Sequence, residues 1–275
     1  MAAEQEGRLP EEAGVEAACR ELLSELAAVG RTGASRGVAL LGPSDGFAAG
    51  LFARLETRLS GGELGLLAPI PPWTGGEGGF FRLVLRHLVG SLERPRAPGG
   101  RVPLRELFAS FAVRRILGRT GRVEAGPRVQ REILEGGRAL LRREAPGADA
   151  DVLAALSGLF RGLAGPACEW LRGAERVPPA LAGLGLAGPI ASEERALAAI
   201  EALSALAWLG GRGVVVWLGR GEVRAGGAPG ALGGRGFAAK AEALARARGT
   251  LVVASAPPAW AGGERWRSLA CVETR

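Results

Sequence analysis

The chain contains few of the residue types that carry most catalytic and metal chemistry. Among its 275 residues there is one histidine, and there is no tyrosine and no asparagine. A metal site built on two histidines is therefore excluded. The three cysteines, Cys19, Cys168 and Cys271, are far apart and lack C-x-x-C spacing, so neither a zinc ribbon nor a disulfide framework is expected. We expect buried, reduced thiols in a cytoplasmic protein.

Lysine and aspartate are also scarce, and this changes how the net charge is interpreted. The chain has 34 arginines and one lysine, Lys240, and 25 glutamates against three aspartates. Such a skew over the whole chain is typical of a GC-rich genome. A net charge of +7 and a pI near 10.8 would otherwise indicate an anionic partner. Because most arginines alternate with glutamates, nucleic-acid binding stays an open alternative.

A long uninterrupted hydrophobic run is missing as well. The longest apolar stretch, 196–218, contains Glu201 and Arg212 and predicts a helix followed by a buried strand, not a membrane span. Residues 1–14 are acidic and have no apolar segment, so we expect a flexible leader and no signal peptide. Because 47% of the residues are hydrophobic, a disordered chain is excluded.

The remaining sequence, 15–275, alternates between helical patterns and short apolar runs. Short apolar strands separated by helices predict an α/β fold with a parallel sheet covered on both faces. We expect one core with a helical insertion at about 104–210. The expected helices outside this insertion are 15–29, 47–59 and 80–92, and the expected strands are 37–42, 63–70, 213–218, 250–256 and 268–273.

Two motifs overlap in the turn after the first expected strand. Residues 42–46 match the G-x-S-x-G nucleophile elbow, with Ser44 as the nucleophile. That fold needs several strands before the elbow, and a histidine after the acid. The only histidine, His87, lies in an apolar helix and is expected to be a surface or core residue. A serine hydrolase is therefore not expected.

The second motif is the phosphate loop G-x-x-x-x-G-K-[ST], whose backbone N–H groups, lysine and hydroxyl bind phosphates and Mg²⁺. Phe47 stands in place of the second glycine, and Ala48 and Ala49 replace the lysine and the Ser/Thr. Asp45 would repel an anion. We interpret the turn as a degenerate phosphate loop formed by Gly42, Ser44, Asp45, Gly46, Phe47, Ala48 and Ala49.

Residues 167–222 resemble a segment of the AAA+-type ATP-binding proteins of bacteriophage-exclusion (BREX) systems in bacteria. Members of that family have four features in the same order: a helix ending in W-L-x-G (here 170–173), a short hydrophobic loop, an Ala/Leu-rich helix, and a strand ending in Asp-Glu-x-Glu. The resemblance extends over about 15–260. It implies a P-loop NTPase (AAA+-like) sheet flanked by helices, with the helical insertion placed before the Walker B strand.

The resemblance also implies which catalytic positions have changed. The Mg²⁺-binding aspartate falls on Gly219 and the water-activating glutamate on Arg220, and the last acid is retained as Glu222. Ser255 corresponds to the polar residue of the sensor strand. No C-terminal helical lid is expected after it. We therefore expect no catalytic residue, no metal ligand and no bound ATP.

These observations favour a catalytically inactive AAA+-like protein, a pseudo-ATPase. It would act as a scaffold or regulatory partner through protein–protein contacts in a bacterial defence or signalling assembly, with an active ATPase or a related regulator as its partner. The alternative is a basic DNA- or RNA-binding module that uses the arginine-rich loops 93–101 and 114–131. An active NTPase with unorthodox residues is a third hypothesis.

Overall fold

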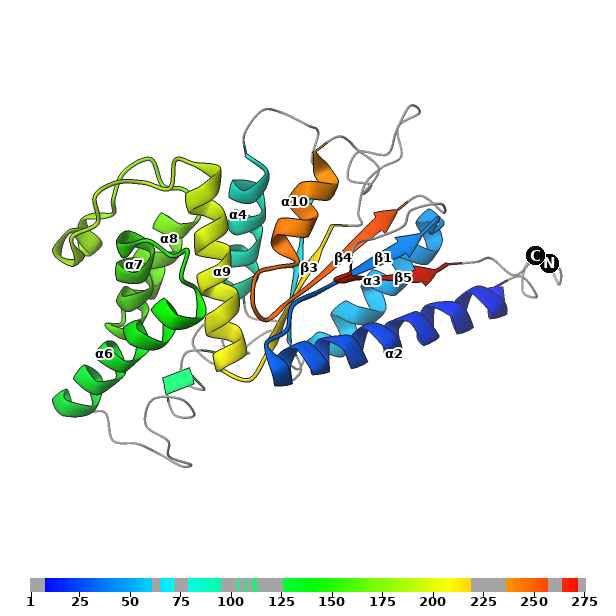
Figure 1. The fold of residues 1–275 in the computed structure, drawn as a ribbon, viewed down its shortest axis with the longest axis horizontal. Coiled ribbons are helices and arrows are strands. Elements are labelled where there is room, and N and C mark those ends of the chain that lie inside the picture. Colours follow the sequence, from blue (N-terminus) through cyan, green and yellow to red (C-terminus); the bar gives the residue numbers. More distant parts are fainter. Residues whose placement is uncertain are drawn as a thin grey trace. The chain divides into compact units, whose positions relative to one another are not determined.

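The protein is described by a computed structural model that covers 8–60, 65–71, 79–94, 103, 107, 111–112, 126–218, 236–256 and 264–271. The chain divides into two compact units, drawn in Figure 1. The first consists of Met1–Gly76, Gly213–Arg246 and Thr250–Arg275, and the second of Glu77–Arg212 and Ala247–Gly249. The second unit is thus inserted into the sequence of the first.

The first unit is an α/β domain with a five-stranded sheet in the order β2-β3-β4-β1-β5. All neighbouring strands pair in parallel, so the predicted parallel α/β fold is confirmed. Its elements are α2 (Arg8–Thr32), β1 (Arg36–Leu41), α3 (Asp45–Leu59), β2 (Gly65–Pro69), β3 (Gly213–Trp217), α10 (Phe237–Leu244), β4 (Thr250–Ala256) and β5 (Trp266–Ala270).

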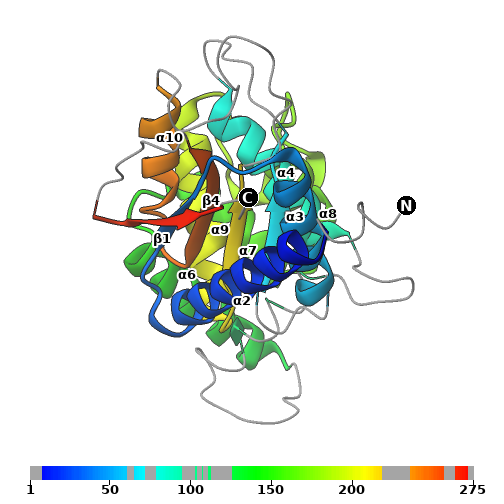
Figure 2. The same ribbon diagram turned by 90° about the vertical axis from the view of Figure 1, so that its right-hand side faces the viewer.

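Helices cover this sheet on both faces. α2 and α3 lie together on one face, and α10 lies on the other beside β4 (Figure 2). Leu22, Leu26 and Leu51 from the two helices share a core with Val215 and Val253 of the central strands. Strands buried on both faces must be apolar along their whole length, and β3 is buried at every position.

Several element boundaries differ from the sequence prediction, and three of the differences have a structural reason. α2 already begins at Arg8, so the described part of the expected flexible leader, 8–14, is helical. α3 begins at Asp45 and not at 47, because Ser44 caps it. β5 spans Trp266–Ala270 instead of 268–273, because its ends are set by pairing with β1 and not by an apolar run.

The described residues of the second unit form helices only. They are α4 (Phe80–Glu93), α6 (Pro127–Glu144), α7 (Ala150–Phe160), α8 (Ala164–Leu171), the 3₁₀ helix η2 (Pro179–Leu184) and α9 (Glu193–Leu209). α4 packs on α9, and α7 packs on both α6 and α8. The unit begins before α4, whereas the sequence analysis placed the start of the helical insertion at about 104. None of the helices in the described ranges combines the length and apolarity needed to cross a membrane.

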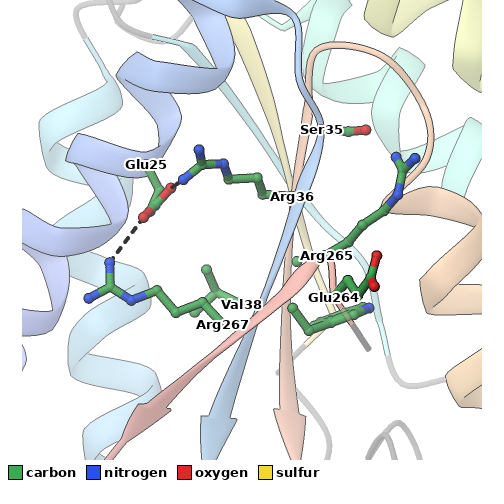
Figure 3. A pocket seen from close by; sticks show the side chains of 9 residues that line it. Glu25, Ser35, Arg36, Val38, Glu264, Arg265 and Arg267 are labelled. Atoms are coloured by element: carbon green, nitrogen blue, oxygen red, sulfur yellow. Dashed lines mark hydrogen bonds and ion pairs between the residues drawn. The ribbon is translucent and has the colours of Figure 1, made fainter. Parts of the chain in front are cut away.

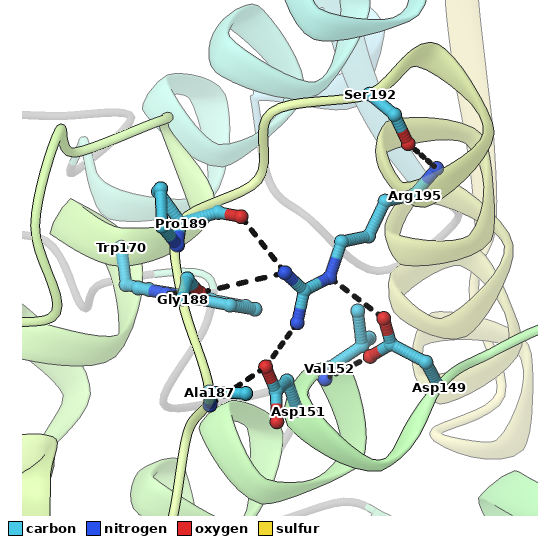
Figure 4. Close-up of polar contacts among 9 residues, drawn as sticks. All are labelled: Asp149, Asp151, Val152, Trp170, Ala187, Gly188, Pro189, Ser192 and Arg195. Carbon is cyan, nitrogen blue, oxygen red and sulfur yellow. Dashed lines mark hydrogen bonds and ion pairs between the residues drawn. The ribbon is translucent and has the colours of Figure 1, made fainter.

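An arginine in α9 connects three segments of this unit (Figure 4). The Arg195 guanidinium donates from Nε to Asp149 Oδ2 at 2.6 Å, pairs with Asp151, and donates to the Pro189 carbonyl at 2.8 Å. Asp151 is 8% exposed and also accepts the Ala187 N–H at 2.9 Å. The network therefore holds the start of α7, the segment 187–189 and α9 together.

Candidate functional site

The turn between β1 and α3 lies at the carboxyl edge of the sheet. β1 ends at Leu41 and α3 begins at Asp45. Gly42 has φ +56°, a left-handed conformation that favours glycine. Its N–H donates to the Ala256 carbonyl at the end of β4 at 2.9 Å. The turn is therefore fixed between the ends of two neighbouring strands.

This place is a topological switch point of the sheet. From β1 the chain passes through α3 to β2, on the far side of β4 and β3. The connection from β4 runs in the other direction along the sheet, past β1 to β5. Ligands of open α/β sheets bind where connections leave adjacent strands in opposite directions. The predicted phosphate loop thus lies where such a sheet would bind a ligand.

At the N-terminus of α3, a side chain of the protein itself takes one of the backbone N–H groups. Ser44 is the N-cap: its Oγ accepts the Phe47 N–H at 3.0 Å, and its carbonyl accepts the Ala48 N–H at 3.0 Å. N–H groups at this position otherwise point towards an anion. The exposed Asp45 carboxylate in the first turn adds a negative charge at the positive end of the helix dipole.

Phe47 occupies an apolar position below this turn. It is 9% exposed and belongs to the same core as Leu51 and the α2 residues. A phosphate loop needs four residues between its two glycines, so that its backbone can wrap around the phosphates. Here only Pro43 and Ser44 lie between Gly42 and the helix. The turn is a short capped strand-to-helix connection and not a cradle.

The other positions of the degenerate loop belong to the first two turns of α3. Gly46 and Ala49 are exposed and Ala48 is partly exposed. None of these side chains carries a charge or a hydroxyl group. They therefore supply neither the cation that contacts a transferred phosphate nor the oxygen that holds Mg²⁺.

Ser255, the residue expected at the sensor position, lies beside the turn, whereas the three expected Walker B positions lie outside the described residues. Ser255 in β4 is partly buried and is paired with Leu40 of β1. It directly precedes Ala256, whose carbonyl accepts the Gly42 N–H. Gly219, Arg220 and Glu222 lie outside the described residues.

β3, the expected Walker B strand, ends in a buried tryptophan. Trp217 is completely buried, and its ring meets Phe52 of α3 edge-on with centroids 5.6 Å apart. Its Nε1–H has no hydrogen-bond partner among the described residues. At this end of the strand, the space between sheet and α3 is filled by aromatic side chains.

The structure provides no support for Ser44 as the nucleophile of a nucleophile elbow. Ser44 Oγ accepts a backbone N–H, as an N-cap does. His87 lies on α4 in the second unit and is partly buried. Burial, together with the charges of Arg86 and Arg94, lowers the pKa of His87. The described residues give it no carboxylate that would orient it as a base.

Metal and thiol chemistry have no site in the described ranges. Within them, no group of three or more His, Cys, Asp or Glu side chains is placed to hold a metal ion. All three cysteines are buried free thiols, as expected. Burial raises the pKa of Cys168 to about 12 and that of Cys271 to about 11, so both stay protonated at neutral pH.

A charged cavity at the opposite edge of the sheet was not predicted (Figure 3). It has a volume of about 290 Å³ and lies where β1 and β5 begin. Glu25 of α2 pairs with Arg36 at 2.5 Å and with Arg267 at 3.0 Å. These residues come from three distant segments, so no local sequence pattern could identify them. Arg267 also pairs with Glu21 of α2, so two glutamates balance two arginines in an ion-pair network that joins α2 to both strands.

No protein-family model, curated protein sequence or solved structure matches this chain. The functional interpretation therefore rests on the sequence and on the geometry of the two units.

Proposed function

We propose that this chain is a catalytically inactive AAA+-like protein that acts as a scaffold or regulatory partner in a bacterial multi-protein assembly. The observation that carries the proposal is the closed turn at the switch point of the sheet. There, Ser44 caps α3, Asp45 adds a negative charge, and Phe47 is buried in the core. In a nucleotide-binding turn, phosphate would occupy the space that Phe47 fills and would accept the N–H that Ser44 caps.

The strand order supports a relationship to P-loop ATPases. The strand assigned to the sensor, β4, lies between β1, which leads into the degenerate loop, and β3, the assigned Walker B strand. The ends of all three strands are therefore neighbours at one edge of the sheet. A nucleotide site that uses a phosphate loop, a metal-binding acid and a sensor requires this arrangement.

The loss of catalysis follows from the residues at these positions. Phosphoryl transfer depends almost entirely on positioning and on charge compensation by a lysine and Mg²⁺. Ala48 and Ala49 supply neither the cation nor the hydroxyl, and glycine and arginine stand where the Walker B acids belong. We accordingly propose that the protein needs neither ATP nor Mg²⁺, and that an active ATPase or a related regulator is its partner.

The first test is titration of the full chain with ATP, with and without Mg²⁺, by calorimetry and thermal shift. A ligand at about 100 times its Kd stabilises a protein by about 2.7 kcal/mol, which a thermal shift detects easily. We expect no saturable heat and no shift in Tm. Mg²⁺-dependent binding with a micromolar Kd, or ATP hydrolysis by the purified chain, would contradict the proposal.

The partner is tested separately. The tagged chain is used to isolate binding proteins from its source cells, and each candidate ATPase is then purified and assayed alone. We expect a direct complex in which the chain changes the ATPase rate of the partner. A complex that leaves this rate unchanged would support a scaffold and argue against a regulator.

A further inference from the structure

α6 carries a row of arginines on one side. Arg128, Arg131, Arg138 and Arg142 are separated by three, seven and four residues, spacings that place side chains on the same face of an α-helix. Two acidic residues of α6 lie beside these arginines by their spacing: Glu132, four residues after Arg128, and Glu135, four residues after Arg131. We call these four residues, together with Arg161 after α7, the arginine row.

Arg161 belongs to the row because α7 packs on α6 (Figure 1). A cavity of about 370 Å³ is lined by Arg131, Arg138 and Arg161, together with Pro127, Leu134 and Glu135. The Nη2 of Arg138 donates to Ser157 Oγ at 3.1 Å, and this buried serine donates in turn to a carbonyl of its own helix. One guanidinium of the row is thus held in place by the fold.

The row differs from other arginines of the same unit in lacking acidic partners. Arg82, Arg172, Arg195 and Arg248 each form an ion pair with a glutamate or an aspartate. Within the described ranges, no carboxylate lies within ion-pair distance of Arg128, Arg131, Arg142 or Arg161. Arg128, Arg131, Arg142 and Arg161 are also exposed. Five arginines therefore face two neighbouring glutamates, Glu132 and Glu135, so the row presents an excess of positive charge.

We propose that the arginine row binds the phosphate backbone of double-stranded DNA. From Arg128 to Arg142, α6 rises about 21 Å at about 1.5 Å per residue. One DNA strand presents a phosphate about every 3.4 Å along the axis, so the row spans several phosphates. The planar guanidinium group matches the geometry of a phosphate with two parallel hydrogen bonds.

The chemistry of the surface favours duplex DNA over two other anionic partners. Binding of single strands relies on aromatic side chains on which bases stack, and the described residues lining the cavity include no aromatic one. Protein interfaces are centred on buried apolar or aromatic anchors, and here Pro127 and Leu134 are the apolar lining residues. An extended row of cations on one helix face complements an extended polyanion.

For a nucleic-acid-binding module, the sequence predicts phosphate contacts in the loops 93–101 and 114–131. Of these, only 93–94 and 126–131 are described, and Arg128 and Arg131 of the row come from the second segment. The row lies entirely in the second unit, whereas the closed turn lies in the first. The outcome of the DNA-binding test is therefore independent of the outcome of the ATP titration.

The test measures binding of the full chain to a fluorescent DNA duplex of about 20 base pairs by anisotropy, over a series of salt concentrations. The test variant is Arg131→Gln/Arg142→Gln/Arg161→Gln. Each lost phosphate contact lowers the slope of log K against log salt by about 0.9. We expect the slope to fall by about 2 to 3 and the affinity at moderate salt to fall at least about tenfold.

A matched control removes the same charge elsewhere. Arg20, Arg31 and Arg176 are exposed, and the described residues give them no ion pair. In the variant Arg20→Gln/Arg31→Gln/Arg176→Gln we expect an affinity within about twofold of wild type. Exposed substitutions of this kind change stability by about 0.5 kcal/mol or less, and thermal unfolding verifies that both variants fold.

Three outcomes would overturn the proposal. Equal loss of affinity in the two triple variants would mean that only the net charge matters. Row-dependent binding of single-stranded DNA or polyglutamate as tightly as the duplex would assign the row to single strands or to an acidic protein. Absence of duplex binding at low salt would leave the row without a nucleic-acid role.

Discussion

At the scale of the residue, Phe47 distinguishes the turn most clearly from a phosphate loop. It is 9% exposed within the core of the first unit. We expect Phe47→Ala to lower the free energy of unfolding by about 3 kcal/mol, the lower end of the range for such truncations, measured by urea denaturation. Ala49→Gly, at an exposed helical position, should cost about 1 kcal/mol. If Phe47→Ala instead bound ATP, the phenylalanine would be a plug in an otherwise intact site.

Arg195 connects three segments of the second unit. Its side chain is 21% exposed, and its partner Asp151 is almost fully buried. Removing the cation leaves the buried Asp151 carboxylate without its charge partner, so Arg195→Gln should lower the unfolding free energy by about 3 kcal/mol. Chemical denaturation measures this loss.

A surface ion pair and a double variant serve as controls for Arg195. The pair between Arg246 and Glu242 is more exposed and has a 3.6 Å separation, so Arg246→Gln should change stability by less than about 0.5 kcal/mol. Adding Asp151→Asn to Arg195→Gln should recover part of the loss. Additive effects of the two substitutions would show that their interaction contributes nothing.

At the scale of the element, the start of α3 depends on a single side chain. Ser44 Oγ accepts the Phe47 N–H, and loss of an N-cap costs about 1 kcal/mol. Ser44→Ala should therefore lower the unfolding free energy by that amount, whereas Ser44→Asp should retain the cap and the stability. Equal destabilisation by both substitutions, measured by thermal unfolding, would show that the hydroxyl has a role other than capping.

The strands of the sheet were predictable to different degrees for a physical reason. β4 coincides with the expected strand 250–256, and β3 with most of 213–218, because central parallel strands are buried on both faces and are continuously apolar. β5 begins with Trp266 and Arg267 and has exposed positions. An edge strand is not fully covered, so its apolar signal is weak.

The candidate site could be located from the sequence, but its geometry could not. A glycine between an apolar strand and a helix is a local pattern, so the sequence predicts a strand-to-helix turn after the first strand, and the structure has it at 42–44. The cap formed by Ser44 and the contact of Gly42 with Ala256 depend on tertiary structure. The arginine row was also missed as a surface, since Arg161 joins it only through the packing of α7 on α6.

At the scale of the whole molecule, the distribution of charge says more than its sum. A net charge of +7 can reflect a compositional skew, and many arginines indeed lie in ion pairs that neutralise them. In the described part of the chain, the arginine row lies on two packed helices, and three of its members, Arg131, Arg138 and Arg161, line one cavity. The arginine-rich composition of the chain thus includes one defined surface whose binding to DNA can be measured.

The pH dependence of stability is also a property of the whole molecule, and the chain's single histidine makes it simple to interpret. Burial, with Arg86 and Arg94, lowers the pKa of His87 below its usual value of about 6.5. As the pH falls through that value, the unfolded chain binds a proton that the folded chain does not. The free energy of unfolding should therefore decrease between about pH 7.5 and pH 5.5.

Comparison of wild type with His87→Gln, by urea denaturation at both pH values, isolates this contribution. Glu201 acts in the opposite direction, because burial raises its pKa and the folded chain then takes up the proton at the higher pH. Wild type should lose more stability on acidification than His87→Gln, and Glu201→Gln should lose more than wild type. An identical loss in wild type and His87→Gln would mean that the imidazole is as well hydrated in the folded protein as in the unfolded chain.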